Sequence, residues 1–242
     1  MMPPICLARL FFYNSLGDFD GAFLMPEPIT VAVMGGGLTG LLYRFGKADF
    51  RHVKRALDVA GAAVLLVPLG PVILFFAILV KLTSPGSAFF HQVRVGQNGQ
   101  LFKIVKLRTM HTDAERSSGP VWARKRDDRT TRLGGFLRKT HIDEFPQLLN
   151  VLRGEMSLIG PRPERPFFVN KFKHEITNYS KRLLVKPGIT GLAQVRYKYD
   201  ETLLDVRNKL TYDLVYVKRM SWTLDVRVVL WTVRMFGGRN AH

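Results

Sequence analysis

The chain has 242 residues, enough for one good-sized domain or two small ones with a buried core. Lysine and arginine outnumber aspartate and glutamate by 17, so we expect an anionic partner such as nucleic acid, lipid head groups or sugar nucleotides. A single cysteine excludes an internal disulfide and argues against a cysteine-based zinc site, which fits a protein facing a reducing cytoplasm.

Residues 1–50 give the weakest sequence signals for structure or function. Their apolar run near the start is too short for a signal peptide and is followed by no convincing cleavage site. We interpret this stretch as a leader that is flexible or lies at an interface.

Residues 59–80 contain no charged side chain, and at about 1.5 Å per residue they could cross a bilayer core as one straight helix. A single-pass anchor is one interpretation. Pro68, Gly70 and Pro71 lie in the middle, however, and both flanks are basic, which is typical of the cytoplasmic side. These features favour a re-entrant helix-break-helix, broken at Gly70 and Pro71, that enters and leaves by the same face.

A β-hairpin is predicted next. Residues 88–95 and 101–107 are rich in Phe, Val and Ile, and the Gln-Asn-Gly-Gln sequence between them is a strong turn signal. Lys106 and Arg108 emerge at the end of the second strand, where exposed charges need no function. The polar, heavily charged residues 111–132 are typical of a solvated loop.

A short helix is predicted to begin at Asp143 and Glu144. Apolar residues follow at i, i+3, i+4 and i+7, and Gly154 provides a stop signal. Since Pro146 is tolerated only in a first turn, both carboxylates should lie at the helix start. The apolar residues are Phe145, Leu148, Leu149 and Leu152.

Two interpretations of this acidic pair stay open on the local sequence. Thr140-x-x-Asp143 fits a helix-capping pattern, in which acidic residues face the positive end of the helix dipole. Alternatively, a helix N-terminus with Arg138, Lys139 and Arg162 nearby would keep a carboxylate ionised and attract phosphate oxygens, so that one carboxylate acts as a nucleophile and its neighbour binds a metal.

Three further elements are predicted in the C-terminal half. Residues 156–163 suggest an extended piece in which prolines hold Arg162 in a stiff loop, suited either to a phosphate or to a structural turn. Residues 166–184 suggest a basic amphipathic helix. Residues 203–216 and 224–236 suggest two more helices, the second of which would suit a lipid interface.

Several blocks, in one order, resemble the bacterial sugar transferase family of monotopic phosphoglycosyl transferases. They are Lys54-Arg55 before the apolar segment, Ser84-Pro85-Gly86, Phe89-Phe90-x-Gln92-x-Arg94-Val95-Gly96, Lys106-x-Arg108-Thr109-Met110, Asp143-Glu144-x-Pro146-Gln147, Gly160-Pro161-Arg162-Pro163 and Lys186-Pro187-Gly188-Ile189-Thr190-Gly191. Gly70-Pro71 stands where the family usually has Ser-Pro at its membrane break.

The resemblance implies an α+β fold with three parts: a leader (1–50), a re-entrant membrane helix (51–84) and a cytoplasmic catalytic domain (85–242) at the bacterial inner membrane. It implies transfer of a sugar 1-phosphate, most simply a hexose phosphate, from a UDP-sugar to polyprenyl (undecaprenyl) phosphate with release of UMP. This would be the first membrane step of exopolysaccharide or related glycan synthesis. A homodimer is compatible with this interpretation.

The resemblance also implies roles for individual residues. Asp143 would be the nucleophile that forms an aspartyl phosphosugar intermediate, and Glu144 would bind Mg²⁺. Substrate phosphates would be held by other residues of the same blocks, namely Arg138, Arg162, Lys106, Arg108 and Gln147.

Two other classes of protein remain. A nucleic-acid-binding protein would explain the charge, but neither the proline-interrupted apolar segment nor the acidic pair. A basic membrane adaptor without catalysis would explain that segment. Nucleic acid is therefore not expected as a partner, whereas membrane lipid is.

Overall fold

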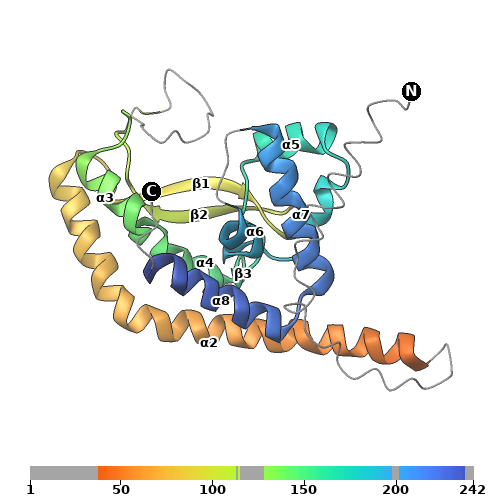
Figure 1. Cartoon of the computed structure of the whole chain (residues 1–242). Helices are drawn as coiled ribbons and strands as arrows, with labels where there is room; N and C mark the ends of the chain where they lie inside the picture. The colour runs from red at the N-terminus through yellow and green to blue at the C-terminus, as the bar shows by residue number, and fades with distance from the viewer. Residues whose placement is uncertain (1–37, 113, 115–127, 198–201, 238–242) are drawn as a thin grey trace, which may run out of the picture. The chain divides into compact units, whose positions relative to one another are not determined.

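The computed structural model describes residues 38–112, 114, 128–197 and 202–237 (Figure 1). The chain divides into a unit of residues 1–46 and a larger unit of residues 47–242. In the first unit the described residues begin helix α2. Most of the predicted leader and most of the predicted loop at 111–132 lie outside the described residues.

Helix α2 (Leu38–Thr83) contains the apolar segment and is helical throughout. Pro68 and Pro71 lie inside it, and Figure 1 shows the helix bending as it turns from α8 towards α3. Where the sequence predicts a break at Gly70 and Pro71, the structure thus has a bend in a continuous helix. Proline removes one hydrogen bond and kinks a helix, but it does not force the flanking turns to unwind.

Much of α2 exposes large apolar side chains. Among the described residues, Phe50–Thr83 is the one helix long and apolar enough to cross a membrane, and 11% of its most apolar window is buried. Because water-exposed apolar surface of this extent is unfavourable, the helix is suited to lipid. The large side chains exposed from residue 53 to residue 82 are Val53, Leu57, Val64, Leu65, Val67, Leu74, Phe75, Ile78 and Leu82.

The predicted hairpin is confirmed. Strands β1 (Phe89–Val95) and β2 (Leu101–Leu107) pair antiparallel around the 3₁₀ turn η1 (Gln97–Gly99). Asn98 and Gly99 adopt positive φ angles of 55° and 83°, which asparagine and glycine tolerate best.

The acidic pair lies in a 3₁₀ helix. Helix α3 (Arg132–Thr140) ends at His141, whose φ of 57° redirects the chain into η2 (Ile142–Gln147) and then α4 (Leu148–Arg153). Gly154, with a φ of 85°, ends α4 as predicted. The predicted apolar face is only partly correct: the tighter 3₁₀ turn changes the phase of the helix, so Leu149 is exposed.

The rest of the described chain adds a second, two-stranded sheet and further helices. Strand β3 (Ser157–Ile159) pairs in parallel with β4 (Gly188–Thr190). The single helix predicted over 166–184 is instead α5 (Pro166–Glu175) followed by the 3₁₀ helix η3 (Tyr179–Leu184). Helices α6 (Leu192–Arg196), α7 (Leu203–Arg219) and α8 (Trp222–Gly237) complete the described fold, and the last two confirm the predicted pair.

The sheet-and-helix part of the chain that follows α2 packs on one side of this helix. Ala62 is buried with Phe102, Val151 and Met156, and Ala77 belongs to the next cluster along the helix. Small alanine side chains allow the neighbouring chain to come close. Helix α2 and the sheet-and-helix part of the chain that follows it therefore pack in a shared core.

Polar contacts fix the start of this packing. Lys54 donates to Asp225 of α8 at 2.7 Å, and Asp58 accepts the backbone N–H of Leu158 at 3.0 Å. Arg55 donates to the carbonyls of the last turn of α4, which carry the negative end of the helix dipole. The Lys54-Arg55 block thus ties α2 to the second half of the chain.

Candidate functional site

Strand β2 and η2 meet at a partly buried ion pair. Nζ of Lys106 lies 2.6 Å from Oε1 of Glu144. The flanking residues Val105 and Leu107 are buried, so the strand fixes the base of the lysine while its long side chain reaches η2. Burial lowers the pKa of Lys106, and Glu144 opposes that shift.

The loop after β3 brings Arg162 to the same carboxylate. Its Nη2 lies 2.6 Å from Oε1 of Glu144, and its Nη1 lies 3.3 Å from Oε2. Burial alone would raise the pKa of Glu144, but Arg162 and Lys106 outweigh it and hold that pKa well below its ordinary value. Glu144 is therefore ionised and positions two cations beside its neighbour.

Asp143 lies within this cluster and is 7% exposed. Among the described residues, no side chain or backbone group forms a hydrogen bond or ion pair with its carboxylate. Burial raises the pKa of Asp143, whereas Lys106 and Arg162 act to lower it. The carboxylate of Asp143 is thus buried beside cations, without a hydrogen-bond donor of its own in the described part of the chain.

Arg138 approaches from the last turn of α3. Its Nε donates to the hydroxyl of Thr109 at 2.9 Å and its Nη1 to the hydroxyl of Thr130 at 3.2 Å, so neutral groups hold the charge in place. It is one of the cations that act to lower the pKa of Asp143. The hydroxyl of Thr140 donates back to Phe136, and hence does not form the predicted cap.

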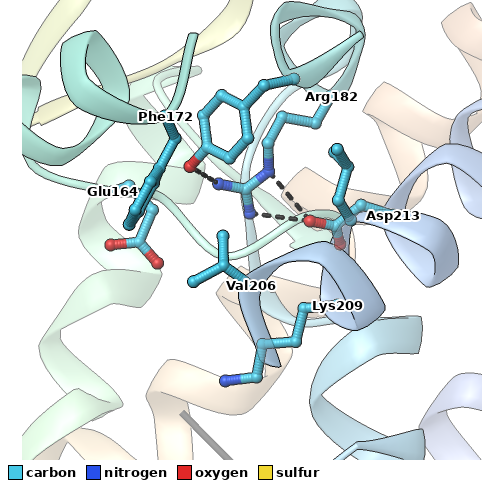
Figure 2. A pocket seen from close by; sticks show the side chains of 8 residues that line it. Glu164, Phe172, Arg182, Val206, Lys209 and Asp213 are labelled. Carbon is cyan, nitrogen blue, oxygen red and sulfur yellow. Dashed lines mark hydrogen bonds and ion pairs between the residues drawn. The ribbon is translucent and has the colours of Figure 1, made fainter. Parts of the chain in front are cut away.

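A second buried ion pair supports the loop that carries Arg162. Arg182 of η3 forms an ion pair with Asp213 of α7, in which its Nε and Nη2 lie 2.9 and 2.8 Å from Oδ2; Figure 2 shows the guanidinium facing Asp213. Its Nη1 donates to the hydroxyl of Tyr179 at 3.0 Å, and Nη2 also donates to the backbone carbonyl of Arg162 at 2.8 Å. Arg182 thereby fixes the backbone of the loop that carries Arg162.

Two glycines let this loop approach β4. A Cβ atom on Gly160 would collide with the carbonyl oxygen of Lys186, and one on Gly188 would collide with the backbone N of Gly160. The Gly160 and Lys186 sequence blocks are thus in backbone contact. Their glycines serve close packing of two chain segments.

The structure does not bring all the predicted site residues together. Lys106, Asp143, Glu144 and Arg162 form one cluster with Arg138 nearby. Arg108 instead donates to the carbonyls of Ser84 and Pro85, at the end of α2.

Gln147 lies in the same 3₁₀ helix as Asp143 but forms no hydrogen bond with the cluster among the described residues. It is 1% exposed, and its Nε2 has no hydrogen-bond partner among the described residues. Arg182 and Asp213 have no role in the sequence-based predictions, because they lie 31 positions apart and carry no local signal of their pairing.

Glu144 does not fit a magnesium ion in this arrangement. Mg²⁺ prefers carboxylate oxygens free of cations, and both oxygens of Glu144 already contact Lys106 or Arg162. No group of three His, Cys, Asp or Glu side chains with metal-binding geometry occurs among the described residues. Lysine and arginine donors beside these carboxylates suit the cluster to a phosphate-bearing ligand.

Comparisons with known proteins agree with this chemistry. Residues 50–238 match the model of the family described as bacterial sugar transferase. A UDP-N-acetylgalactosamine-undecaprenyl-phosphate N-acetylgalactosaminephosphotransferase of Aeromonas hydrophila is 45% identical, over 78% of this chain and 46% of its own length. A UDP-glucose:undecaprenyl-phosphate glucose-1-phosphate transferase of Caulobacter vibrioides is 46% identical, over 74% of this chain and 68% of its own length.

A shorter relative covers the same region. The exopolysaccharide production protein PSS of Rhizobium leguminosarum is 40% identical, over 75% of this chain and 93% of its own length. The chain thus spans less than half of the Aeromonas protein but nearly all of this one. The cluster of Asp143, Glu144 and Arg162 lies inside the matched residues, and the chain belongs to the bacterial sugar transferase family.

Proposed function

We propose that this protein is a phosphoglycosyl transferase that moves a sugar 1-phosphate, with a hexose as the sugar, from a UDP-sugar to undecaprenyl phosphate and releases UMP. The two substrates are anionic, in keeping with the excess of 17 basic residues. The relatives named above act on UDP-N-acetylgalactosamine and on UDP-glucose, so their names support this substrate class and leave the sugar open. By the same reasoning the product starts an exopolysaccharide or related glycan.

Asp143 performs the first step. An oxygen of its carboxylate attacks the sugar-bearing phosphorus of the UDP-sugar, and the bond from that phosphorus to the bridging oxygen breaks as UMP leaves. The lipid phosphate oxygen then attacks the same phosphorus, which releases Asp143 as a carboxylate and yields a polyprenyl diphosphate sugar. Two steps avoid bringing two polyanions together at once.

The neighbouring cations bind and stabilise charge. Lys106 and Arg162 lie where phosphoryl oxygens would approach Asp143, and they act as preorganised donors in a partly dry site. The side chain of Arg162 is 39% exposed, so it can move towards a substrate while Arg182 keeps its backbone in place. Glu144 orients both cations and is a positioning residue.

Mg²⁺ remains part of the proposal as a requirement of the reaction. When bound, it would offset charge on the pyrophosphate oxygens. Since Glu144 is engaged by two cations, no step above depends on a metal held by Glu144.

The site belongs at the cytoplasmic face of the bacterial inner membrane, where we propose that α2 is re-entrant. The basic residues at both ends of the apolar segment and the prolines within the bent helix support this placement. Helix α8 adds an exposed apolar stripe that is suited to the lipid interface. Its members are Trp222, Val226, Val229, Leu230 and Val233.

The isolated carboxylate of Asp143 between Lys106 and Arg162 carries this proposal. Detergent-solubilised protein should release UMP from at least one UDP-sugar of a panel when polyprenyl phosphate is present. With the UDP-sugar alone, rapid quenching and mass spectrometry should find the sugar phosphate on Asp143, and Asp143→Asn should abolish both signals. Normal turnover by well-folded Asp143→Asn protein would refute the assignment, and membrane binding without any UMP would favour an adaptor.

A further inference from the structure

A basic pocket lies beside the first turns of α2, on a set of residues separate from the Asp143 cluster. It encloses about 620 Å³, part of it open to solvent. Four basic side chains and one acidic one line it, namely Arg51, Lys54, Arg55, Lys186 and Asp58. The rest of the lining comes from β3, α7 and the adjoining loops.

Most of this positive charge is not neutralised by carboxylates. Lys54 is paired with Asp225 at 2.7 Å and lies 3.7 Å from Asp58. Arg55, by contrast, donates only to neutral backbone carbonyls. Within the described part of the chain, Arg51 and Lys186 have no hydrogen-bond or ion-pair partner.

Two of these cations converge on one point although they repel each other. A Cβ atom built on Gly154 would lie 3.4 Å from Nη2 of Arg55 and 3.7 Å from Nζ of Lys186. Burial, with the charge of Arg55 adding to it, lowers the pKa of Lys186. Like charges held together in this way favour an anion between them.

The position of the pocket indicates which anions can reach it. It lies where the basic residues of α2 give way to the apolar segment, and Val53 and Leu57 of the same turns are 54% and 41% exposed. Basic side chains at the end of a lipid-exposed helix lie at the level of the lipid phosphates.

We propose that this pocket binds the phosphate group of a membrane lipid, with Arg51, Arg55 and Lys186 as its ligands. A bound phosphate would bridge α2 and the loop before β4, and so join the membrane helix to the rest of the fold. The proposal rests on the membrane placement given above but not on sugar-phosphate transfer. An anionic phospholipid and polyprenyl phosphate share this chemistry, and the experiment separates them.

The test is lipid retention by the full chain, measured by native mass spectrometry from mixed micelles. The probes are phosphatidylglycerol, polyprenyl phosphate and, as a lipid without phosphate, diacylglycerol. The double variant Arg51→Gln/Lys186→Gln removes two charges that form no hydrogen bond or ion pair with the described residues. The matched control, Lys171→Gln/Lys173→Gln, removes two exposed charges from α5, which Figure 1 shows far from α2.

We expect the pocket variant to retain phosphatidylglycerol about tenfold less well than the wild type, and the control to retain it normally. A loss confined to polyprenyl phosphate would also support a lipid-phosphate site, and would identify the acceptor substrate as its ligand. Unchanged retention of both lipids, or an equal loss in the control, would overturn the proposal. The same measurement in Asp143→Asn protein keeps this outcome independent of catalysis.

A second measurement needs no pocket variant. In the native chain, phosphatidylglycerol should protect Lys186 from an amine-acylating reagent several-fold, whereas the exposed Lys171 should react equally with and without the lipid. Equal acylation of Lys186 under both conditions would contradict the proposal even if the double variant failed to fold.

Discussion

Asp143 and Glu144 are adjacent carboxylates with opposite electrostatic environments. Burial raises the pKa of Asp143, whereas Arg162 and Lys106 overcome burial and hold that of Glu144 well below its ordinary value. A folded-state pKa above the unfolded value means that ionising Asp143 at neutral pH costs folding free energy. The depressed folded-state pKa of Glu144 means that its ionised carboxylate stabilises the fold at pH values above its ordinary pKa. This stabilisation is lost as the pH falls through the depressed pKa.

The two amide variants should therefore differ in stability. Glu144→Gln leaves two partly buried cations without a counter-charge, and should lower the free energy of unfolding by about 3–5 kcal/mol. Asp143→Asn removes a charge that is unfavourable to bury, and should unfold at or above the wild-type temperature while losing activity by about 10³-fold or more. Thermal unfolding in detergent at pH 7 checks both; equal destabilisation would contradict the assigned environments.

Lys106 should determine the pH at which activity is lost on the acid side of the pH profile. Its positive charge acts to lower the pKa of Asp143, so Lys106→Gln should raise that pKa further and move the acid limb of the pH profile to higher pH. The measurement is UMP release as kcat/KM against pH for wild type and variant with the same substrates, so that substrate ionisation cancels. Lys103→Gln, on an exposed side chain of the same strand, should leave the limb in place. A limb that moved to lower pH would disprove this role.

At the scale of elements, the loop bearing Arg162 depends on contacts made by η3 and α7. Asp213→Asn would leave the buried guanidinium of Arg182 without its carboxylate, at a cost of about 3–5 kcal/mol in the free energy of unfolding. Because Arg182 also binds the carbonyl of Arg162, the folded fraction should show a lower kcat. Glu175→Gln, which removes an exposed carboxylate of α5, is the control. Wild-type kcat in folded Asp213→Asn protein would limit this pair to a structural role.

Local sequence predicts the hairpin, Gly154 as the end of α4 and the two last helices, since turn residues and apolar periodicity act over a few positions. The local sequence does not predict that η2 is a 3₁₀ helix or that α5 ends at Glu175, because both features depend on tertiary packing. The local sequence also does not predict the Arg182–Asp213 pair, since the two residues are far apart in the chain. The residues of the Asp143 cluster are predicted from the family resemblance, and the structure adds that Glu144 is engaged by two cations.

At the scale of the whole molecule, the open question is how the bent α2 lies in the bilayer. A re-entrant helix requires Val53 and Leu82, exposed near its two ends, to meet the same aqueous compartment, whereas a spanning helix places them on opposite sides. The 34 residues of Phe50–Thr83 would extend about 50 Å if straight, more than the roughly 30 Å of a hydrocarbon core. Length alone therefore permits either topology, and the prolines and basic flanks favour re-entry.

Cysteine labelling distinguishes the two topologies. In a Cys6→Ser background, Val53→Cys and Leu82→Cys should both stay unlabelled by a membrane-impermeant maleimide in intact spheroplasts and should both react once the cells are lysed. Matched turnover of the two variants and the parent would show that the fold is retained. Labelling of only one of the two positions in intact cells would place the ends of the helix on opposite faces. The re-entrant geometry would then be wrong, even if the chemistry proposed for Asp143 were correct.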